Sequence, residues 1–426
     1  MEFSVTKSNG SLVQPSKPTP STTLDLSRID RLPVLRCNAR TLHVFEAIGP
    51  LGVAQSTIRE ALSKALVPYY PLAGRLTSNG SNIDCTGDGV WFVEATANCS
   101  LKSVGYFEDV TSIPFNELLP PHPHETLGVD PLVLMQVTEF EGDGFVMGLT
   151  FCHTICDGLG AAQFLNAISE FARGIDPLTI TPVWQRDFIP QPQLTSPSNL
   201  QLPPNFVFPD YNLVQTNIDI PLHHITDLKN KFIEENKVVH CSSFEIVAAI
   251  LWKNRTHAIG LGPESRTMKL VFFANCRPLV EPPLPKGFYG NCFFPVTITT
   301  SSDILTQASL DEVVKMIQEA KARLPEEFAH WVNVNELNGL KTEDPFAPPL
   351  GYDTLFVSEW GRLGFNQVDY GNGPPVHVVP MQGSAIIPVA IVGMLPRPNK
   401  GVRLMTWCVQ KDHLEPFLES IATIAQ

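Results

Sequence analysis

The sequence predicts an α+β fold with mixed β-sheets in two halves. Strand patterns outnumber helix patterns, and they occur as hairpins with helices between them, as at 132–140 and 145–151. A proline-rich stretch at 181–210 separates residues 1–180 from residues 211–426, and we interpret it as a long crossover between the halves. No repeat of about 20 to 50 residues is present, which excludes a solenoid.

Hydrophobic periodicity and turn residues predict the elements of residues 1–180 in order. They are an edge strand at 2–13, a turn-like segment at 24–30, a strand at 42–48, a helix at 56–66 that begins at Ser56, a strand at the end of 67–76, a hairpin of 83–85 with 90–95, a hairpin of 132–140 with 145–151, and a helix from about 161 that ends at Gly174.

The same signals predict the elements of residues 211–426. They are a helix at 242–257, strands at 268–275 and 292–299, a helix at 310–323, several strands between 352 and 408, and a helix at 414–425.

Composition and charge exclude several classes of protein. The chain of 426 residues is 43% hydrophobic and 17% charged, as is typical of a well-packed globular protein, and its net charge of −13 argues against a nucleic-acid partner. The N-terminus has no signal-peptide pattern, and the apolar runs fall short of the roughly 20 residues that a membrane span requires. Nine scattered cysteines fit a reducing compartment rather than a disulfide framework. We therefore expect a cytoplasmic protein with no membrane association.

One six-residue motif combines a histidine, an aspartate and a glycine: His153-Thr-Ile-Cys-Asp157-Gly158. It follows the uncharged apolar strand at 145–151. A neutral imidazole is available at physiological pH, because histidine ordinarily titrates near pH ~6.5, so His153 is placed to act as a general base. The alternative is a core histidine whose ring is satisfied by the backbone.

Two observations help to weigh this motif. The same His-x-x-x-Asp spacing occurs from His223 to Asp227, in a polar stretch that predicts a helix start with Thr226 or Asp227 as its cap, so spacing alone does not define a site. Cys152 and Cys156 flank the histidine, but no further cysteine or histidine cluster completes four ligands, and we expect no metal.

Asp157 has two possible roles. It could orient His153 as the carboxylate of a catalytic triad. However, the chain has no Gly-x-Ser-x-Gly elbow, and no Ser or Cys is a good candidate for the nucleophile. Alternatively Asp157 is buried and paired with an arginine, because an isolated buried carboxylate is costly.

Two helix starts could bind phosphate groups. Gly158-Leu-Gly160 follows a strand and opens a helix, but the third glycine and the later acidic residue of a dinucleotide fingerprint are absent. Ser242, Ser243 and Glu245 also open a helix, which carries Lys253 further along. The helix N-terminus could bind an anion, or it could be an ordinary capping box.

The motif and seven other segments, in order along nearly the whole chain, resemble the plant BAHD acyl-CoA-dependent acyltransferases. The seven are Leu26-Ser-Arg-Ile-Asp30, Tyr70-Pro-Leu-Ala-Gly-Arg75, Cys85-Thr-Gly-Asp-Gly89, Cys241-Ser-Ser-Phe-Glu245, Asn275-Cys-Arg277, Tyr289-Gly-Asn291 and Asp369-Tyr-Gly-Asn-Gly373. Two further segments, Ala161-Ala-Gln-Phe-Leu165 and Pro182-Val-Trp-Gln-Arg186, are most similar to the branch that acylates alcohols of taxoids and benzyl-type compounds.

The resemblance implies two chloramphenicol-acetyltransferase-like halves, each a mixed sheet with flanking helices, and a channel between them. His153 would sit in the channel, deprotonate an acceptor hydroxyl, and promote its direct attack on an acyl-CoA thioester without an acyl-enzyme. Asp157 would be structural and paired with Arg277, and Gly158 would permit the tight turn into the helix. Ser242, Ser243 and Lys253 are the candidate CoA contacts.

The second motif of the family is usually Asp-Phe-Gly-Trp-Gly, and here it reads Asp369-Tyr370-Gly371-Asn372-Gly373. The resemblance implies that Asp369 and Gly371 are structural. The Asn372 amide could donate to an oxyanion or shape the acceptor pocket. The alternative is a loop residue with no catalytic part.

These inferences predict a monomeric plant enzyme of specialised metabolism that esterifies a small-molecule alcohol from an acyl-CoA co-substrate, with no permanently bound cofactor. N-acylation of an amine, or a catalytically silent member with a binding role, are the alternatives. Phe293, Phe294, Tyr352 and Phe356 suggest an aromatic-lined region. The sequence names neither the acyl group nor the acceptor.

Overall fold

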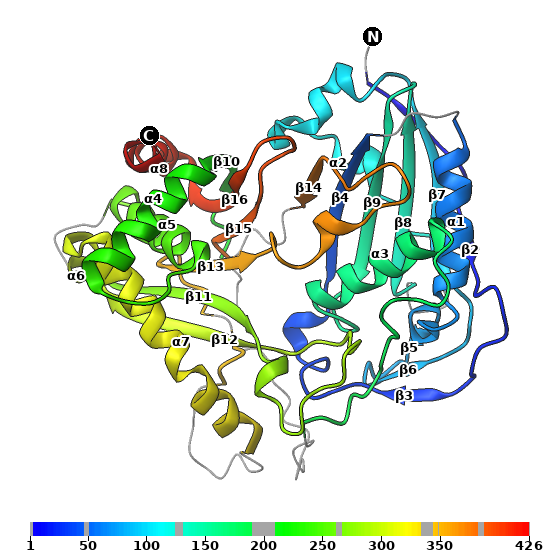
Figure 1. Ribbon diagram of the computed structural model, residues 1–426, viewed down its shortest axis with the longest axis horizontal. Helices are drawn as coiled ribbons and strands as arrows, with labels where there is room; N and C mark the ends of the chain where they lie inside the picture. The colour runs from blue at the N-terminus through cyan, green and yellow to red at the C-terminus, as the bar shows by residue number, and fades with distance from the viewer. Residues whose placement is uncertain are drawn as a thin grey trace.

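Two large β-sheets with associated helices make up most of the molecule (Figure 1). The computed structural model describes residues 3–46, 51–123, 131–189, 209–260, 266–333, 344–347, 349–381 and 387–425. The predicted α+β architecture in two halves is confirmed. Residues 190–208, most of the predicted crossover, lie outside the described residues.

Among the described residues, the first sheet has seven strands in the order β1-β7-β8-β9-β4-β14, and β2 also pairs with β7. The predicted hairpin is confirmed, because β8 and β9 pair antiparallel from Val133 opposite Phe151 to Phe140 opposite Gly144. The strands are β1 Val5–Lys7, β2 Ser11–Val13, β4 Asn38–Glu46, β7 Val90–Ala97, β8 Val133–Phe140, β9 Gly144–Cys152 and β14 His377–Pro380.

The strand β14 joins the first sheet although it comes from the C-terminal part of the chain. It pairs antiparallel with β4, with Val378 opposite His43. The division of the chain at 181–210 does not account for this exchange. The exchange places the second motif, which precedes β14, against the first sheet.

The second sheet has six strands among the described residues, in the order β10-β16-β15-β13-β11-β12. The pairs β11–β13 and β13–β15 are parallel, and the others are antiparallel, so this sheet is mixed. The strands are β10 Leu213–Pro221, β11 Thr267–Asn275, β12 Phe293–Ser301, β13 Thr354–Glu359, β15 Val389–Met394 and β16 Gly401–Gln410.

A small third sheet corrects one predicted hairpin. We expected 83–85 to pair with 90–95, but β6 (Asn82–Asp84) pairs with β3 (Thr23–Asp25) and β5 (Arg75–Leu76), while β7 joins the first sheet. The turn residues of 86–89 therefore connect two sheets rather than two paired strands.

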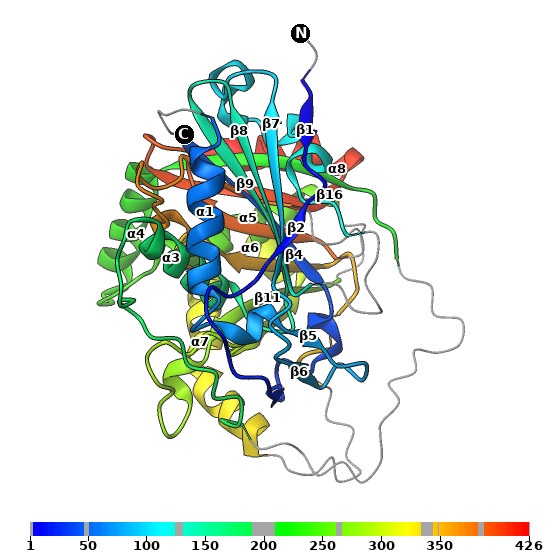
Figure 2. The ribbon, with the colours of Figure 1, turned by 90° about the vertical axis from the view of Figure 1, so that its right-hand side faces the viewer.

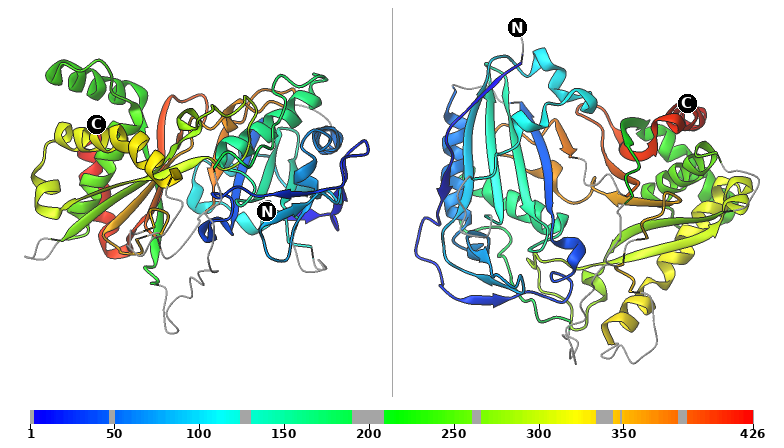
Figure 3. Two further views of the ribbon diagram at one scale, coloured as in Figure 1. Left: turned by 90° about the horizontal axis from the view of Figure 1, so that it is seen from below. Right: turned by 180° about the vertical axis from the view of Figure 1, so that it is seen from behind.

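The long helices cover the outer faces of the two large sheets. In the N-terminal half, α1 and α3 pack on the first sheet, and α1 crosses the face seen in Figure 2. The helices of the C-terminal half lie beside the second sheet, on the side away from the first (Figure 3). The helices of the N-terminal half are α1 Val53–Ala65, α2 Phe115–Leu118 and α3 Gly158–Ala172. Those of the C-terminal half are α4 Leu222–Asn236, α5 Ser243–Ala258, α6 Ser302–Gln307, α7 Leu310–Asn333 and α8 Lys411–Ala425. Short 3-10 segments occur at Pro33–Leu35, Tyr70–Ala73, Lys102–Phe107, Val110–Ser112, Arg277–Leu279 and Phe365–Gln367, and the one at Lys102–Phe107 is kinked.

Two predicted helix starts were wrong, and α7 is longer than expected. The helix α1 begins before Ser56. The Glu139 carboxylate, which lies on the strand β8, accepts the backbone N–H groups of Gly52 and Gln55 and so caps the start of this helix. The helix α4 begins after Pro221 rather than at Thr226 or Asp227. The helix α7 continues through an internal proline to residue 333 instead of ending near 323.

Apolar side chains join the two sheets. Leu42 and Val146 of the first sheet belong to one buried cluster with Met405 and Trp407 of β16. Beside this cluster, Arg403 makes two hydrogen bonds of 2.7 Å to Asp219. Arg403 also donates to the Glu108 carbonyl of the N-terminal half at 2.8 Å. The halves are therefore fixed to each other next to the space that they enclose.

Candidate active site

A cavity of about 450 Å³ lies between the two sheets. We call it the central cavity; its walls come from β4 and β9 of the first sheet, from β11, β12, β13 and β15 of the second, from the start of α3, and from the segment 360–365. Its lining is largely apolar and aromatic, and includes Phe293, Phe356, Trp360 and Phe365. A concave apolar site with a few polar groups is typical of a small-molecule site.

His153 lines the central cavity. It directly follows β9, and its backbone N–H donates to the carbonyl of Cys37 at 2.9 Å, which continues the pairing of β9 with β4. Its ring lies edge-on to Phe293, with 6.2 Å between ring centroids. Its Nδ1 atom is buried and has no hydrogen-bond partner among the described residues. The ring is therefore not oriented by a carboxylate.

Asp157 uses both carboxylate oxygens in contacts other than with His153. It caps α3 by accepting the Gly160 N–H at 3.0 Å. It also accepts two hydrogen bonds from Arg277, at 2.8 and 2.9 Å, and the Cys292 N–H at 3.2 Å. The triad alternative for Asp157 is not supported, because the carboxylate is occupied by the cap and the guanidinium.

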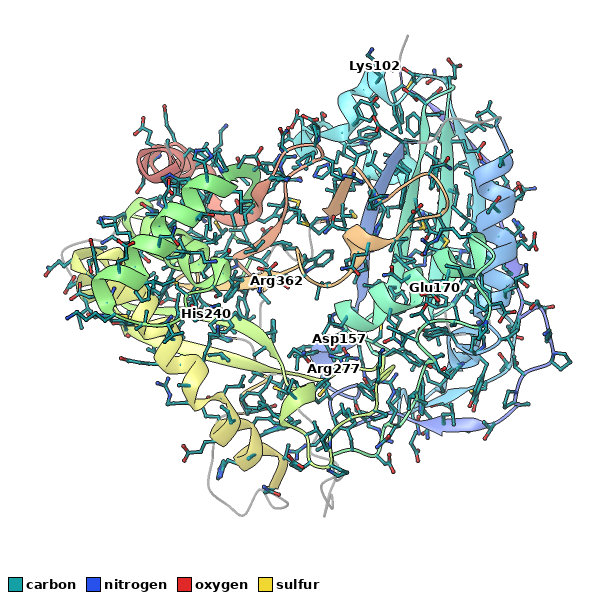
Figure 4. All side chains as sticks on the ribbon, in the orientation of Figure 1. Lys102, Asp157, Glu170, His240, Arg277 and Arg362 are labelled. Atoms are coloured by element: carbon teal, nitrogen blue, oxygen red, sulfur yellow. The ribbon has the colours of Figure 1, made fainter. Side chains whose placement is uncertain are left out.

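Arg277 reaches Asp157 from the C-terminal half, where it follows β11, and Figure 4 shows the two side chains next to each other at the middle of the molecule. Burial alone would lower the pKa of Arg277, but the Asp157 carboxylate raises that pKa above its ordinary value. Arg277 also donates to the Gly290 carbonyl at 2.6 Å. The pair predicted through the resemblance is present, and it links the two halves at the start of α3.

The glycines after Asp157 are required for space rather than for an unusual turn. Gly158 lacks a positive φ, which corrects the expected tight-turn role; a Cβ there would lie 2.5 Å from the Leu363 side chain at the cavity wall. At Gly160 a Cβ would lie 1.9 Å from the Tyr289 carbonyl oxygen. The Tyr289 backbone cannot move aside as the Leu363 side chain can. A side chain is therefore tolerated less well at position 160 than at position 158.

The second motif forms a surface loop against the first sheet. Asp369 accepts the N–H groups of Gly371 and Gly373 at 2.8 Å each, and lies 3.9 Å from Arg173. Gly371 has φ +113°, which favours glycine. Tyr370 is buried, and its hydroxyl donates to the Met147 sulfur.

The predicted role for Asn372 is not supported by its position. Its side chain is exposed and lies outside the lining of the central cavity. The Asp369 carboxylate accepts from the backbone N–H groups of the residues on either side of Asn372, whose side chain faces solvent. We therefore assign Asn372 no contact with an oxyanion or an acceptor.

The candidate CoA contacts are not brought together. Ser242 caps α5 in a complete capping box with Glu245, which is the alternative that the sequence left open. Lys253 lies ten residues beyond Ser243, about 15 Å along the helix. Its ammonium donates to the carbonyls of Thr306 and Ala308 at the end of α6. Among the residues the structure describes, none of the three lines the central cavity.

The aromatic prediction was half right. Phe293 and Phe356 line the central cavity. Phe294 is buried beside Phe293 in one apolar cluster but does not line the cavity, and neither does Tyr352, whose hydroxyl lies 2.8 Å from Nδ1 of His413.

Sequence reasoning missed Glu359, a carboxylate at the end of β13 that also lines the central cavity. It accepts the Gly361 N–H at 2.8 Å and has no ion pair within 4 Å among the described residues. Burial raises the pKa of its carboxyl, although Gly361 and Arg362 partly oppose the shift. A lone glutamate after a strand carries no signal that could have found it.

Cys156 is a thiol in the cavity wall, but it is a poor nucleophile. Burial raises the pKa of the Cys156 thiol well above its ordinary value, and the Asp157 carboxylate adds to the shift. The thiolate that would attack a thioester is therefore scarce. Within the described ranges no cluster of His, Cys, Asp and Glu side chains is suited to a metal ion, and no helix has the length and apolar character of a membrane span. The arrangement places the His153 imidazole in the wall of a cavity large enough for a small molecule.

Comparison with known sequences identifies the class of protein. Residues 3–423 match the model of the Transferase family. The chain is 42% identical to Acyl transferase 4 of Oryza sativa subsp. japonica, over 99% of each chain. It is 38% identical to myricetin 3-O-glucosyl 1,2-rhamnoside 6'-O-caffeoyltransferase AT2 of Crocosmia x crocosmiiflora, again over 99% of each. It is 35% identical to 3'-N-debenzoyl-2'-deoxytaxol N-benzoyltransferase of Taxus canadensis, over 98% of this chain and 95% of the relative.

Solved structures share the fold. Vinorine synthase superposes with a TM-score of 0.75 at 21% identity, covering 99% of this chain and 98% of that chain. TRI101 of F. graminearum, solved with ethyl coenzyme A, gives a TM-score of 0.75 at 13% identity, covering 93% and 96%.

The chain belongs to the Transferase family, the BAHD acyltransferases that its motifs resemble, and it is an acyltransferase. Its relatives act on plant metabolites, and they include both an O-acyltransferase and an N-acyltransferase.

Proposed function

We propose that this protein is an acyl-CoA-dependent O-acyltransferase that esterifies a hydroxyl of a plant specialised metabolite. One observation carries the proposal: His153 stands in the wall of a largely apolar cavity formed jointly by both sheets. Such a cavity excludes water, which would otherwise compete with the alcohol for the thioester.

In the proposed reaction, the neutral His153 imidazole accepts the proton of the acceptor hydroxyl as its oxygen attacks the thioester carbonyl. A C–O bond forms and a tetrahedral intermediate results. The intermediate then collapses, the C–S bond breaks, and the leaving thiolate takes the proton from the imidazolium. The products are an ester and free CoA, and His153 is neutral again.

The transfer is direct in this proposal. The high pKa of Cys156 argues against an acyl-enzyme at the thiol in the cavity wall. The bidentate engagement of Asp157 with Arg277 argues against a triad, in which a carboxylate orients the histidine. We therefore propose that Asp157, Gly158 and Arg277 shape the site, and that Asp369 and Gly371 shape the loop of the second motif.

Acyl-CoA is the proposed donor. The family membership and the ethyl coenzyme A complex of TRI101 both support CoA as the carrier. CoA is a co-substrate here and leaves with each turnover.

N-acylation is the second candidate function, and Glu359 is the observation that favours it. A carboxylate without an ion pair among the described residues could bind the ammonium group of a polyamine while a second, neutral amine is acylated. The N-benzoyltransferase relative is consistent with such chemistry. The hydroxyl of an alcohol acceptor could also donate a hydrogen bond to the Glu359 carboxylate.

The test is an assay of free thiol release with purified protein. Acetyl-CoA, benzoyl-CoA and caffeoyl-CoA are each incubated with benzyl alcohol, a flavonoid glycoside, benzylamine or putrescine, and the products are identified by mass. We expect release that depends on an alcohol and yields the ester. Release that depends only on amines would establish the second candidate, and release without any acceptor would contradict both.

A second measurement tests direct transfer. The protein is mixed with acyl-CoA in the absence of an acceptor, and its intact mass is recorded. We expect the unmodified mass. A stable increase equal to the acyl group, lost when alcohol is added, would show an acyl-enzyme and refute the proposed mechanism.

A further inference from the structure

The backbone carbonyls of residues 153–155, the turn that begins with His153, accept hydrogen bonds from side chains elsewhere in the chain. The Asn291 amide donates to the carbonyl of His153 at 2.8 Å and to that of Thr154 at 3.2 Å. Arg186 donates to the carbonyl of Ile155 at 2.8 Å. Buried carbonyls need such partners, but here all three hydrogen bonds, from two side chains, act on the turn that carries the proposed base.

Asn291 is itself held by a buried carboxylate. Its Nδ2 donates to Asp30 at 2.8 Å, and its backbone N–H donates to the same oxygen at 3.3 Å. Both residues are fully buried. The other Asp30 oxygen accepts the Ser27 N–H at 3.0 Å and lies 3.3 Å from Arg186, whose side chain is also buried. The N-terminal segment therefore anchors the residues that hold the turn.

The orientation of the amide is fixed by its neighbours. The side-chain nitrogen of Asn291 faces three acceptors: the carboxylate of Asp30 and the carbonyls of His153 and Thr154. An oxygen in that place would be repelled by all three. The Asn291 side-chain oxygen has no partner among the described residues, so the amide is held through its N–H groups alone.

The His153 ring lacks the usual means of orientation. In a triad, a carboxylate fixes the ring by accepting from Nδ1. Here Nδ1 has no partner among the described residues, and Asp157 is bonded to Arg277. What holds the ring is its edge-on packing against Phe293 together with the position of its backbone, which the Cys37 carbonyl fixes at the N–H and Asn291 fixes at the C=O.

We propose that Asn291, anchored by Asp30, is a positioning residue that sets the place of the His153 imidazole in the central cavity. The proposal rests on the proposed function, in which His153 is the base. It gives a task to two motifs, Leu26–Asp30 and Tyr289–Asn291, for which the sequence indicated none. A displacement of about 1 Å at a reacting group can cost roughly 100-fold in rate.

The test is Asn291→Ala, assayed with the acyl-CoA and alcohol pair that the thiol-release panel selects. We expect kcat to fall by about 10- to 100-fold, while KM for both substrates stays within about twofold, because Asn291 touches the turn and does not line the cavity. Asn291→Ser keeps one donor but cannot span three acceptors, so its kcat should lie between those of wild type and Asn291→Ala.

The matched control is Asn254→Ala on α5. Asn254 is also buried and donates at 2.7 Å to a backbone carbonyl, that of Ile250, but it lies outside the cavity wall. Both alanine variants should lower Tm, and only Asn291→Ala should lower kcat.

The proposal is overturned if the folded Asn291→Ala protein keeps kcat within about threefold of wild type. If that variant does not fold, unchanged kcat in Asn291→Ser overturns it equally. His153→Ala is assayed alongside to separate the two claims. If His153→Ala is inactive and Asn291→Ala is normal, only the positioning role fails; if His153→Ala is fully active, the proposed function fails as well.

Discussion

Replacement of Asp157 separates a structural carboxylate from a catalytic one. Asp157→Asn keeps a good helix cap at the Gly160 N–H but removes the charge that pairs with Arg277. A hydrogen bond to a charged partner contributes about 1.5–3 kcal/mol, so we expect a loss of about 2–3 kcal/mol in the free energy of unfolding. Asp157→Ala also loses the cap, about 1 kcal/mol more, and leaves Arg277 unpaired, so about 4 kcal/mol is expected.

The assay combines urea unfolding with kcat at a temperature where each variant is folded. We expect Asp157→Asn to lower kcat by less than about tenfold, because the turn keeps its contacts to Asn291 and Arg186. Asp219→Asn is the matched control, since Asp219 makes a similar bidentate pair with Arg403, and neither residue lines the central cavity. The reasoning is refuted if Asp157→Asn leaves stability unchanged and lowers kcat by about 10⁴-fold, as loss of a triad carboxylate does.

Three further substitutions have expected outcomes. Gly160→Ala should lower the free energy of unfolding by about 1–3 kcal/mol or more, because its Cβ would meet the Tyr289 carbonyl, whereas Gly158→Ala meets only a flexible leucine side chain and should lose less in the same urea titration. Asn372→Ala should change kcat by less than about threefold; a loss of about 100-fold would restore its oxyanion role. Glu359→Gln should raise Tm at pH 8 and leave it unchanged at acid pH. Burial raises the pKa of the Glu359 carboxyl, so this group lowers the free energy of unfolding only at a pH where it is ionised. An equal rise in Tm at both pH values would contradict this expectation.

The place of His153 in the cavity was predictable from the sequence because its signal is local. An uncharged strand runs directly into His153, and the structure places that histidine in the cavity wall. The exposed His223, which has the same spacing to an aspartate, starts α4 outside the cavity. The His-x-x-x-Asp spacing is the same at His153 and His223, and only the apolar strand before His153 distinguished the two in the sequence.

The contacts that shape the site were not local. Asp157 and Arg277 are 120 residues apart, and their pairing was expected only through the family resemblance. The cap of α1 by Glu139 crosses 87 residues, so the nearby Ser56 appeared to be the better start. Tertiary partners can replace local caps, and no single-segment pattern reports them.

The second motif shows a different limit. Its resemblance to the family pattern suggested a catalytic amide at Asn372, but the side chain of that residue is exposed, in a loop whose Gly371 and Gly373 N–H groups donate to the Asp369 carboxylate. Conversely, Glu359 lies in the cavity wall because the strand β13 ends there. Where a strand ends relative to a cavity depends on how all strands of the sheet are arranged, and the local sequence does not contain that information.

The most direct test of the central claim compares His153→Ala with His223→Ala in the thiol-release assay. A general base contributes roughly 10²- to 10⁴-fold, so we expect His153→Ala to lose at least about 99% of alcohol-dependent release while it remains folded. His223→Ala should match wild type. The account is contradicted if His153→Ala retains a third or more of the wild-type rate, or if both variants lose activity alike.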